Sequence, residues 1–318
     1  MIHAKTHVLV SDRFDDEAFA RLSASSTLKV SKSLTPDLSG DDLDSVHALV
    51  IRSRTRITRE LLARLPVIQT VITSTSGYDH IDLKDCRERG VKVMFTPTAN
   101  AASACELTWA LLLAAARKLP EAQACVAQAN WQREKLMGFQ FSGKTYGIIG
   151  LGRIGSRVAK VAQAFGLKTL SYDPYRDDAY FANAGCERAK TLSDLIGSSD
   201  VLSLHVPATD ETREMITLDL LKSVRPDGLI FANTSRGTVI AESALIQALD
   251  KGLIRACGLD VYEHEPLPAS SPLIGRPNVV LSPHIGATTH AAFKAASLEA
   301  ADKIIAFAER GIVSDFLP

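Results

Sequence analysis

Three glycines at a fixed spacing form the clearest chemical motif in the sequence. They belong to the run Gly150-Leu151-Gly152-Arg153-Ile154-Gly155, which follows an apolar stretch at 146–149 and opens a stretch with helical spacing. In such a unit the first glycine permits a tight turn, the second lets a pyrophosphate approach the backbone, and the third lets helix and strand pack closely. The helix N-terminus then offers free N–H groups to phosphates. The motif therefore predicts a dinucleotide-binding turn.

A carboxylate at the end of the next predicted strand indicates which dinucleotide would bind. Asp173 follows the strand predicted at 169–172. It lies about 20 residues after the first glycine, where a ribose-binding acid is expected. Because a carboxylate accepts hydrogen bonds from a ribose 2′-hydroxyl and repels a 2′-phosphate, Asp173 favours NAD over NADP. Arg176, three residues further on, leaves NADP possible.

Two polar residues follow later predicted strands, at the edge where open parallel sheets bind their ligands. Arg236 follows the strand at 229–233, and a guanidinium suits a carboxylate through paired N–H bonds. His284 follows the strand at 279–281, in a turn bounded by proline and glycine. From position alone, a surface salt bridge is an equal alternative for Arg236, and a structural role is an equal alternative for His284. Both residues are therefore candidates for a functional site.

The segment 258–266 carries three carboxylates and one imidazole just beyond the strand predicted at 256–259. A carboxylate beside a histidine favours the imidazolium form and orients the ring. Spacing alone does not decide between Glu263 and Glu265 as the partner of His284, and an acidic solvated loop is the alternative interpretation.

Short β-branched runs alternate with helical stretches along the chain, which is typical of parallel sheets joined by crossover helices. In the first third, strands are predicted at 7–10, 48–51, 70–73 and 91–95, and helices at 15–23, 59–65 and 83–89. After residue 145, strands are predicted at 146–149, 169–172, 201–205, 229–233, 256–259 and 279–281, and helices at 155–165, 192–197, 219–223 and 242–251. Two more helices are predicted at 102–118, ended by Pro120, and at 287–310, with less regular structure at 121–143.

These elements predict an α/β fold with two Rossmann-like or flavodoxin-like parallel-sheet domains and a cleft between them. A length of 318 residues suits two domains. Lys plus Arg and Asp plus Glu each number 36, so the basic surplus needed to bind nucleic acid or an anionic membrane is lacking, and neither partner is expected. The longest apolar run, 107–116, is about half the length of a membrane span.

Cysteine usage and the N-terminus indicate a cytoplasmic protein. The five cysteines are Cys86, Cys105, Cys125, Cys186 and Cys257, and none forms a C-x-x-C pair. We therefore expect reduced thiols and no metal site. The apolar run at 8–10 is followed at once by polar residues, so no signal peptide is predicted.

The motifs, taken together and in order, resemble the D-isomer-specific 2-hydroxyacid dehydrogenase family over essentially the whole chain. The matching pieces are 150–155, Asp173, 203–207, 233–237, 258–266 and 282–288. Within this family the sequence is most similar to the D-3-phosphoglycerate dehydrogenases, in 52–55 and 192–207. The resemblance implies NAD-dependent hydride transfer at C2 of a D-2-hydroxy acid.

The resemblance also implies roles for single residues. Arg236 would bind the substrate carboxylate and polarise the C2 oxygen, His284 would be the general acid and base, and Glu265 would pair with His284. The expected cofactor-binding residues are Gly150, Gly152, Arg153, Ile154, Gly155, Asp173, His205, Pro207, Thr234, Ser235, Asp260 (at the nicotinamide amide) and Gly286. The expected substrate-binding residues, besides Arg236, are Ser74, Thr75, Ser76 and Gly77, through backbone N–H groups, and Arg54, which suits a distal phosphate.

The resemblance further implies a substrate-binding domain made of 1–100 plus 290–318 and an NAD-binding domain at 101–289. It implies a homodimer, with the helix at 102–118 and the segment up to 143 in its interface. No C-terminal regulatory domain fits within the length, so serine feedback is not expected.

The substrate stays open at this point. Phosphoglycerate and a smaller 2-keto acid such as glyoxylate or hydroxypyruvate are equally compatible with the sequence. An acid at Glu265 argues against a formate dehydrogenase, where an amide stands at this position. An NAD-sensing corepressor-like binding protein is a remote alternative that would keep the same residues.

Overall fold

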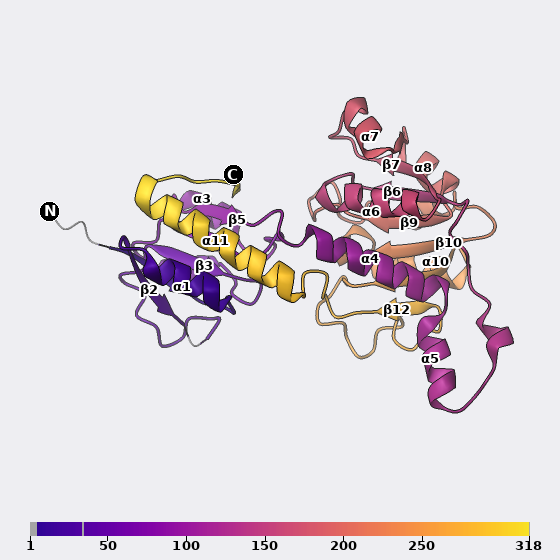
Figure 1. The fold of residues 1–318 in the computed structure, drawn as a ribbon, viewed down its shortest axis with the longest axis horizontal. Coiled ribbons are helices and arrows are strands. Elements are labelled where there is room, and N and C mark those ends of the chain that lie inside the picture. Colours follow the sequence, from indigo (N-terminus) through magenta and orange to yellow (C-terminus); the bar gives the residue numbers. More distant parts are fainter. Residues whose placement is uncertain (1–4, 34, 318) are drawn as a thin grey trace. The chain divides into compact units, whose positions relative to one another are not determined.

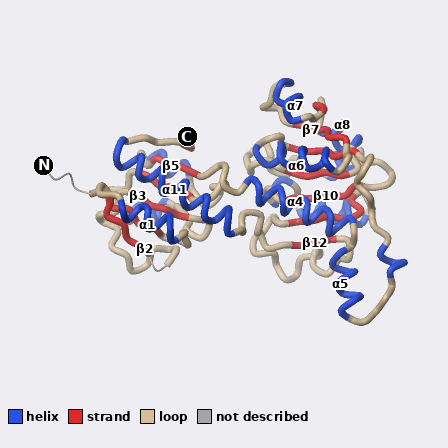
Figure 2. The backbone as a smooth tube through the Cα atoms, in the orientation of Figure 1, coloured by secondary structure: helices blue, strands red, loops and turns tan. Residues whose placement is uncertain are grey.

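The computed structural model describes residues 5–33 and 35–317. Its contacts divide the chain into two compact units: unit 1 is Met1–Asn100 with Thr288–Pro318, and unit 2 is Ala101–Ala287 (Figure 1). Each unit has its own sheet with helices on both faces, so the prediction of two parallel-sheet α/β domains is confirmed. Figure 2 shows strands and helices alternating through both units.

Unit 1 contains a six-stranded sheet with the strand order β13-β5-β4-β3-β1-β2. The strands are β1 (Thr6–Val10), β2 (Leu28–Lys32), β3 (Ala48–Ile51), β4 (Thr70–Thr73), β5 (Lys92–Phe95) and β13 (Phe316–Leu317). The helices are α1 (Asp16–Ala24), α2 (Arg59–Ala63), α3 (Leu83–Glu88) and α11 (His290–Arg310). All strand pairs are parallel except β13 with β5.

Alternate residues of these strands face opposite layers, as a pleated sheet requires. Val50, Ile72 and Met94 pack in one core with Ala300 and Ile304 of α11. The residues next to them in sequence, Leu49, Val71 and Val93, pack in the other core with side chains of α2 and α3. The C-terminal helix α11 is therefore an integral layer of the N-terminal sheet.

Unit 2 contains a seven-stranded parallel sheet with the order β12-β11-β10-β9-β6-β7-β8. The strands are β6 (Thr145–Ile149), β7 (Lys168–Tyr172), β8 (Glu187–Arg188), β9 (Val201–Leu204), β10 (Leu229–Asn233), β11 (Ile254–Leu259) and β12 (Val279–Leu281). The helices are α4 (Ala101–Ala116), α5 (Leu119–Ala127), α6 (Arg153–Ala164), α7 (Asp178–Ala184), α8 (Leu192–Ser198), α9 (Leu218–Leu221) and α10 (Glu242–Asp250).

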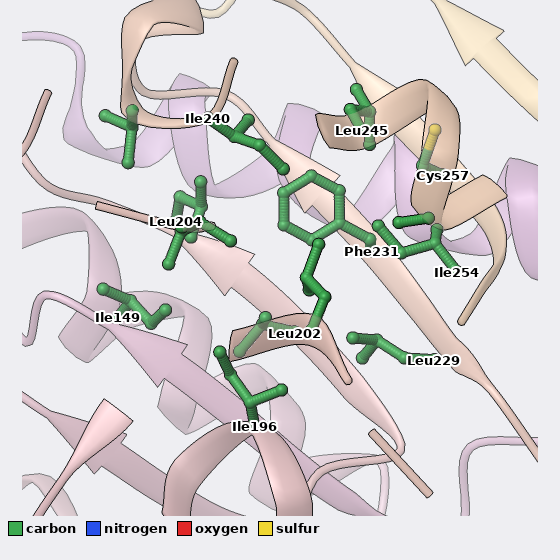
Figure 3. Close-up of a cluster of buried hydrophobic side chains, with 14 of the residues drawn as sticks. Ile149, Ile196, Leu202, Leu204, Leu229, Phe231, Ile240, Leu245, Ile254 and Cys257 are labelled. Atoms are coloured by element: carbon green, nitrogen blue, oxygen red, sulfur yellow. The ribbon is translucent and has the colours of Figure 1, made fainter. Parts of the chain in front are cut away.

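Two apolar cores lie on the two faces of this second sheet. One contains Phe231 at its centre, among aliphatic side chains of β6, β9 and β11 and of the helices α8 and α10 (Figure 3). The other is formed by α4 and α6. A Cβ added at Gly258 would lie 2.5 Å from the Leu111 Cβ, so a glycine in β11 is needed for the close approach of α4. Within the described residues no helix is both long and apolar enough to cross a membrane.

Several elements were not predicted from the sequence. The edge strand β2 reads Leu-Lys-Val-Ser-Lys and is mostly solvent-accessible, so it has no apolar run that marks a strand. Pro120 was expected to end a helix, but α4 ends at Ala116 and Pro120 lies in the first turn of α5. Proline is tolerated there because the first N–H groups of a helix have no intrahelical acceptor. Residues 119–127 are therefore helical rather than irregular. The short elements α7, β8 and β13 were also missed.

Candidate active site

The glycine-rich turn joins β6 to α6 in the way the motif requires. Gly150 has φ +89°, which disfavours a side chain, and a Cβ added at Gly155 would lie 2.1 Å from the Gly150 carbonyl oxygen. Gly152 precedes α6 without a side-chain cap, and no atom lies within 4 Å of a Cβ built there. The first and third glycines thus serve backbone packing, whereas the second leaves free space beside an uncapped helix N-terminus. This is the cradle that a pyrophosphate fits.

A pocket of about 810 Å³ opens beside this turn. Its walls include Gly150 and Gly152, the residues that follow β7, and residues 205–207 and 209–212 that follow β9. The volume is in the range of small-molecule and cofactor sites. The residues present therefore fit a dinucleotide at this position.

Asp173 connects the glycine-rich turn to the end of β7. Its Oδ2 accepts a hydrogen bond from the Leu151 N–H at 2.9 Å, and its Oδ1 accepts one from the Tyr175 N–H at 3.0 Å. Each carboxylate oxygen can accept more than one hydrogen bond, so these contacts leave room for a ribose hydroxyl. Asp173 therefore orders the turn in addition to lining the pocket.

His205 is held by a short buried hydrogen-bond chain. The Tyr146 hydroxyl donates to Ser203 Oγ at 2.8 Å, and Ser203 Oγ lies 2.8 Å from His205 Nε2. Burial lowers the pKa of His205 to about 3, so this imidazole stays neutral near pH 7. His205 therefore suits a wall of the cofactor pocket and not a proton donor.

His284 and Glu265 form a direct pair at the carboxyl ends of β12 and β11. His284 Nδ1 lies 2.7 Å from Glu265 Oε2. Glu263, which spacing left as the alternative, faces elsewhere: its Oε2 accepts the Glu242 N–H at the start of α10. The His284 side chain is 47% exposed, so the second ring nitrogen, Nε2, remains available to a substrate.

The electrostatics of this pair favour its charged form. The hydrogen bond that His284 donates to Glu265 raises the pKa of His284 above its ordinary value, against the opposing effects of partial burial and of the charge of Arg236. Burial acts to raise the pKa of Glu265, but the hydrogen bond and charge of His284 prevail and lower it. The contact therefore favours the imidazolium form of His284 and the carboxylate form of Glu265, with the Arg236 guanidinium in their neighbourhood.

Asp260 fixes the turn that carries His284. Its carboxylate is fully buried and accepts three hydrogen bonds, from Ser282 Oγ at 2.6 Å and from the N–H groups of Ile285 and Gly286 at 2.8 Å each. His284 has φ +53° within this turn, a conformation that a non-glycine residue adopts only when its surroundings enforce it. The contact of Asp260 with a nicotinamide amide stays a prediction.

The turn after β10 positions Arg236. Asn233 closes this turn by donating to the Arg236 carbonyl oxygen at 2.9 Å and accepting from the Ser235 N–H at 3.0 Å. A Cβ added at Gly237 would lie 1.9 Å from the Tyr262 carbonyl carbon, so glycine lets this turn contact the segment that carries Glu265. Thr234 is anchored by its hydroxyl, 2.7 Å from that of Thr108 in α4.

Unit 1 contains a row of buried polar groups at the carboxyl ends of three neighbouring strands. Arg52, Ser74 and Thr96 are the residues directly after β3, β4 and β5, whose last residues are in register. Within the described part of the chain, Arg52 Nη1, Ser74 Oγ and Thr96 Oγ1 are buried without a hydrogen-bond partner. Arg52 and Thr96 were not predicted as site residues from the sequence. Their position directly after predicted strands, like that of Ser74, is the feature that could have identified them.

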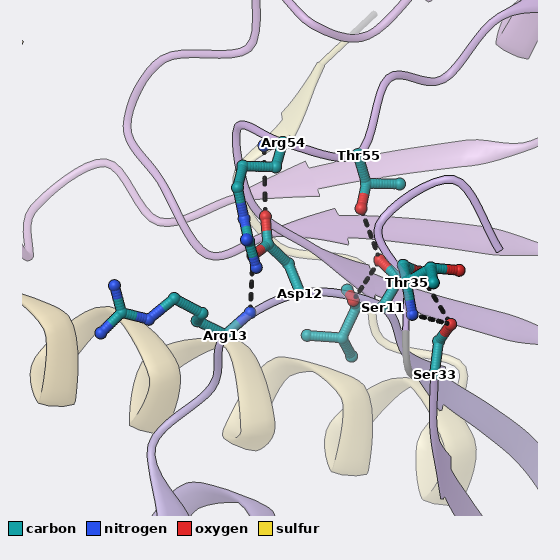
Figure 4. Close-up of polar contacts among 8 residues, drawn as sticks. Ser11, Asp12, Arg13, Ser33, Thr35, Arg54 and Thr55 are labelled. Atoms are coloured by element: carbon teal, nitrogen blue, oxygen red, sulfur yellow. Dashed lines mark hydrogen bonds and ion pairs between the residues drawn. The ribbon is translucent and has the colours of Figure 1, made fainter.

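Arg54, the residue predicted for a distal phosphate, is already paired. Its Nε and Nη2 atoms lie 2.8 and 2.7 Å from the buried Asp12 Oδ1, and its backbone N–H binds Asp12 Oδ2 at 3.2 Å (Figure 4). The loop Ser74–Gly77 is held by its own side chains, since Ser76 Oγ binds Asn100 Oδ1 at 2.6 Å and Thr75 Oγ1 binds the Gly77 carbonyl oxygen at 2.7 Å. The side chains of this loop thus support its backbone.

Comparison with known proteins identifies relatives of both units. Residues 109–286 match the family described as D-isomer specific 2-hydroxyacid dehydrogenase, NAD binding domain. The chain is 37% identical over 297 residues to a D-3-phosphoglycerate dehydrogenase of Methanocaldococcus jannaschii. The aligned region covers 93% of this chain but only 56% of that enzyme. This chain therefore spans about half the length of that relative.

Two further relatives match over their full length. The chain is 37% identical over 313 residues to a hydroxypyruvate reductase of Thermotoga maritima, covering 97% of this chain and 100% of that one. The crystal structure of a D-lactate dehydrogenase from Aquifex aeolicus, complexed with NAD and lactic acid, superposes with a TM-score of 0.82 at 30% identity, covering 97% of this chain and 99% of that one.

The role of Asp260 in holding the His284 turn can be tested through stability. Asp260→Asn replaces a carboxylate whose two oxygens accept the Ile285 and Gly286 N–H groups by an amide with one accepting oxygen and an NH2 group that cannot accept. We expect the free energy of unfolding to fall by about 1.5–3 kcal/mol, the usual worth of hydrogen bonds to a charged group, measured by urea denaturation. Asp250→Asn is the control, because the Asp250 side chain is 57% exposed and forms an ion pair with Arg276 at the surface. Equal stability of the two variants would contradict the role given to Asp260.

Proposed function

The chain belongs to the D-isomer-specific 2-hydroxyacid dehydrogenase family, as its motifs predicted, and we therefore propose that it is an oxidoreductase that moves a hydride between C2 of a D-2-hydroxy acid and the nicotinamide of NAD. The observation that carries this proposal is the His284–Glu265 pair beside Arg236. It lies in the same unit as the glycine-rich turn and its pocket.

The proposed proton transfer uses the free ring nitrogen of His284. Because Nδ1 is engaged by Glu265, Nε2 donates a proton to the substrate oxygen when a 2-keto acid is reduced and accepts it in the reverse direction. Reduction requires the imidazolium, so the raised pKa of His284 extends reduction to higher pH. The bound dinucleotide would supply or accept the hydride.

Arg236 has the complementary role in this proposal. Its guanidinium binds the carboxylate of the substrate through paired N–H bonds and stabilises the negative charge that develops on the C2 oxygen. NAD is the proposed cofactor because Asp173 lies in the wall of the pocket beside the glycine-rich turn and a carboxylate favours a free ribose 2′-hydroxyl.

D-3-phosphoglycerate is the substrate that we propose first. The support is the row in unit 1, where a buried arginine nitrogen and two buried hydroxyls lack partners within the described residues. Burying such groups without hydrogen bonds is costly, and phosphate oxygens accept hydrogen bonds from guanidinium groups and from hydroxyls. Arg52 suits this role better than Arg54, whose guanidinium binds Asp12.

Hydroxypyruvate or a similar small 2-keto acid is the second candidate. The observation in its favour is the full-length match to the hydroxypyruvate reductase, in contrast to the partial match to the longer phosphoglycerate dehydrogenase. The two candidates differ in whether the substrate carries a phosphate.

A substrate panel tests the proposed reaction. We expect purified protein to oxidise NADH with 3-phosphohydroxypyruvate, hydroxypyruvate or glyoxylate, followed by absorbance, and to reduce NAD with D-3-phosphoglycerate. His284→Ala should lower kcat by about 10²–10⁴-fold, the usual size of lost acid–base catalysis. The exposed His264 offers a control, since His264→Ala should leave kcat within about twofold. No turnover with any member of the panel would refute the proposed activity.

The choice between the two substrates is tested at the arginines of unit 1. Arg52→Gln should raise KM for 3-phosphohydroxypyruvate about 10–100-fold, as expected for a lost charged contact, and should change KM for hydroxypyruvate much less. Arg56→Gln is the matched control because Arg56 belongs to the same run but is exposed. Equal effects of Arg52→Gln on both substrates would contradict a phosphate site and favour the smaller substrate.

We also propose that the chain forms a homodimer through α5 and the segment that follows it. Four large apolar side chains in this region, Leu119, Val126, Trp131 and Met137, are 53%, 59%, 79% and 82% exposed, and α5 extends away from the sheet of its own unit (Figure 1). Apolar groups gathered in this way are typical of association surfaces.

Sedimentation velocity at micromolar concentration tests this association. We expect a dimer for the wild type and a monomer for the double variant Trp131→Ser with Met137→Ser, because both substitutions remove exposed apolar area. A wild-type monomer under these conditions would rule out the proposed dimer.

A further inference from the structure

The pocket beside the glycine-rich turn is acidic on two of its walls. Asp173 follows β7, and Asp210 and Glu211 lie in the loop that follows β9; all three line the pocket. The one cation among the described residues that line it is Arg176. The Arg176 guanidinium stacks over the Tyr180 ring of α7 at 4.5 Å from the ring centre, so it is already engaged by its own segment.

The two walls are joined by a side-chain contact. The Tyr175 hydroxyl donates a hydrogen bond to the Glu211 carboxylate, which connects the loop after β7 with the loop after β9. The same contact, with a further contribution from the charge of Asp173, raises the pKa of Tyr175. The carboxylates of Glu211 and Asp173 therefore both act on Tyr175, which lines the pocket.

The loop that carries Glu211 is ordered by its own hydrogen bonds. Thr212 Oγ1 donates to the Pro207 carbonyl oxygen at 2.6 Å and accepts the Thr209 N–H at 2.8 Å. Asp173 is likewise fixed by the N–H groups of Leu151 and Tyr175. The Asp173 carboxylate and the backbone of the loop that carries Glu211 are therefore both held by hydrogen bonds.

We propose that Glu211, held by Tyr175, is a second specificity-determining carboxylate that excludes a ribose 2′-phosphate and so makes the pocket selective for NAD over NADP. This inference rests on the dinucleotide site of the proposed function. A phosphate monoester carries a charge of about −1.5 to −2 at pH 7, and it would meet the carboxylates of Asp173, Asp210 and Glu211 against the one guanidinium of Arg176 in the described lining. NAD carries a hydroxyl at this position, which carboxylate oxygens accept as a hydrogen-bond donor.

Asp173 and Glu211 have different roles in this proposal. Asp173 orders the glycine-rich turn that either dinucleotide would use, so its removal should weaken the binding of both. Glu211 is held by the Tyr175 hydroxyl and lies on the other wall, in the loop that follows β9. Discrimination between NAD and NADP should therefore respond to Glu211 more selectively than to Asp173.

Direct binding measurements test this role without relying on turnover. The dissociation constants for NADH and NADPH are measured by nicotinamide fluorescence for the wild type, Glu211→Gln, Tyr175→Phe and Glu214→Gln. Glu214 is the matched control, since it lies three residues along the same loop and does not line the pocket in the described part of the chain. Glu211→Gln should tighten NADPH binding about tenfold and change NADH binding less than about threefold, in keeping with the loss of one unscreened charge.

Tyr175→Phe should shift the NADPH to NADH ratio in the same direction by a smaller factor, because the carboxylate remains but is no longer held. The effect of Glu211→Gln should shrink in 1 M salt, where charges are screened within about 3 Å. Glu214→Gln should leave the ratio unchanged.

The proposal is overturned if Glu211→Gln leaves the ratio of the two constants unchanged, if Glu214→Gln changes it equally, or if the wild type binds NADPH as tightly as NADH. A protein that binds NADH selectively, loses this selectivity in Glu211→Gln and yet reduces no 2-keto acid would uphold the inference while refuting the proposed reaction.

Discussion

The buried carboxylate of Asp260 holds the turn on which the chemistry of unit 2 depends. A buried carboxylate is costly unless hydrogen bonds replace its water, and here all three of its donors come from residues 282–286. These bonds keep His284 in its left-handed conformation and direct its Nδ1 to Glu265. The position of His284, the proposed proton-transfer group, thus follows from one electrostatic requirement of the core.

The carboxyl-end edge of each parallel sheet concentrates the polar groups of that unit. In unit 2 the neighbouring strands β6, β9, β10, β11 and β12 are followed by the glycine-rich turn, His205, Arg236, Asp260 and His284. In unit 1 the neighbouring strands β3, β4 and β5 are followed by Arg52, Ser74 and Thr96. Because parallel strands end at a common edge, residues that are distant in sequence become neighbours in space through strand order alone.

Part of this could be predicted from sequence because it is local. The glycine-rich turn and the strands with continuous apolar runs were predicted close to their observed positions. The partner of His284 was not fixed by spacing, since Glu263 is captured by the Glu242 N–H, a contact 21 residues away in sequence. Arg54 was predicted from the family resemblance, and its pairing with Asp12, 42 residues away in sequence, left no local signal that could have argued against it. The polar edge strand β2 and the proline-started helix α5 were missed because neither has the apolar pattern of a buried element.

The central claim is that Glu265 keeps His284 protonated for reduction, and an NMR titration of the His284 imidazole tests it most directly. The account predicts that His284 in the wild type titrates above its ordinary pKa of about 6.5, so that the imidazolium is lost only as the pH rises through this higher value. In Glu265→Gln the raising contact is gone while burial and Arg236 still act, so the pKa should fall. A wild-type pKa at or below about 6.5, or an identical titration in Glu265→Gln, would contradict the account.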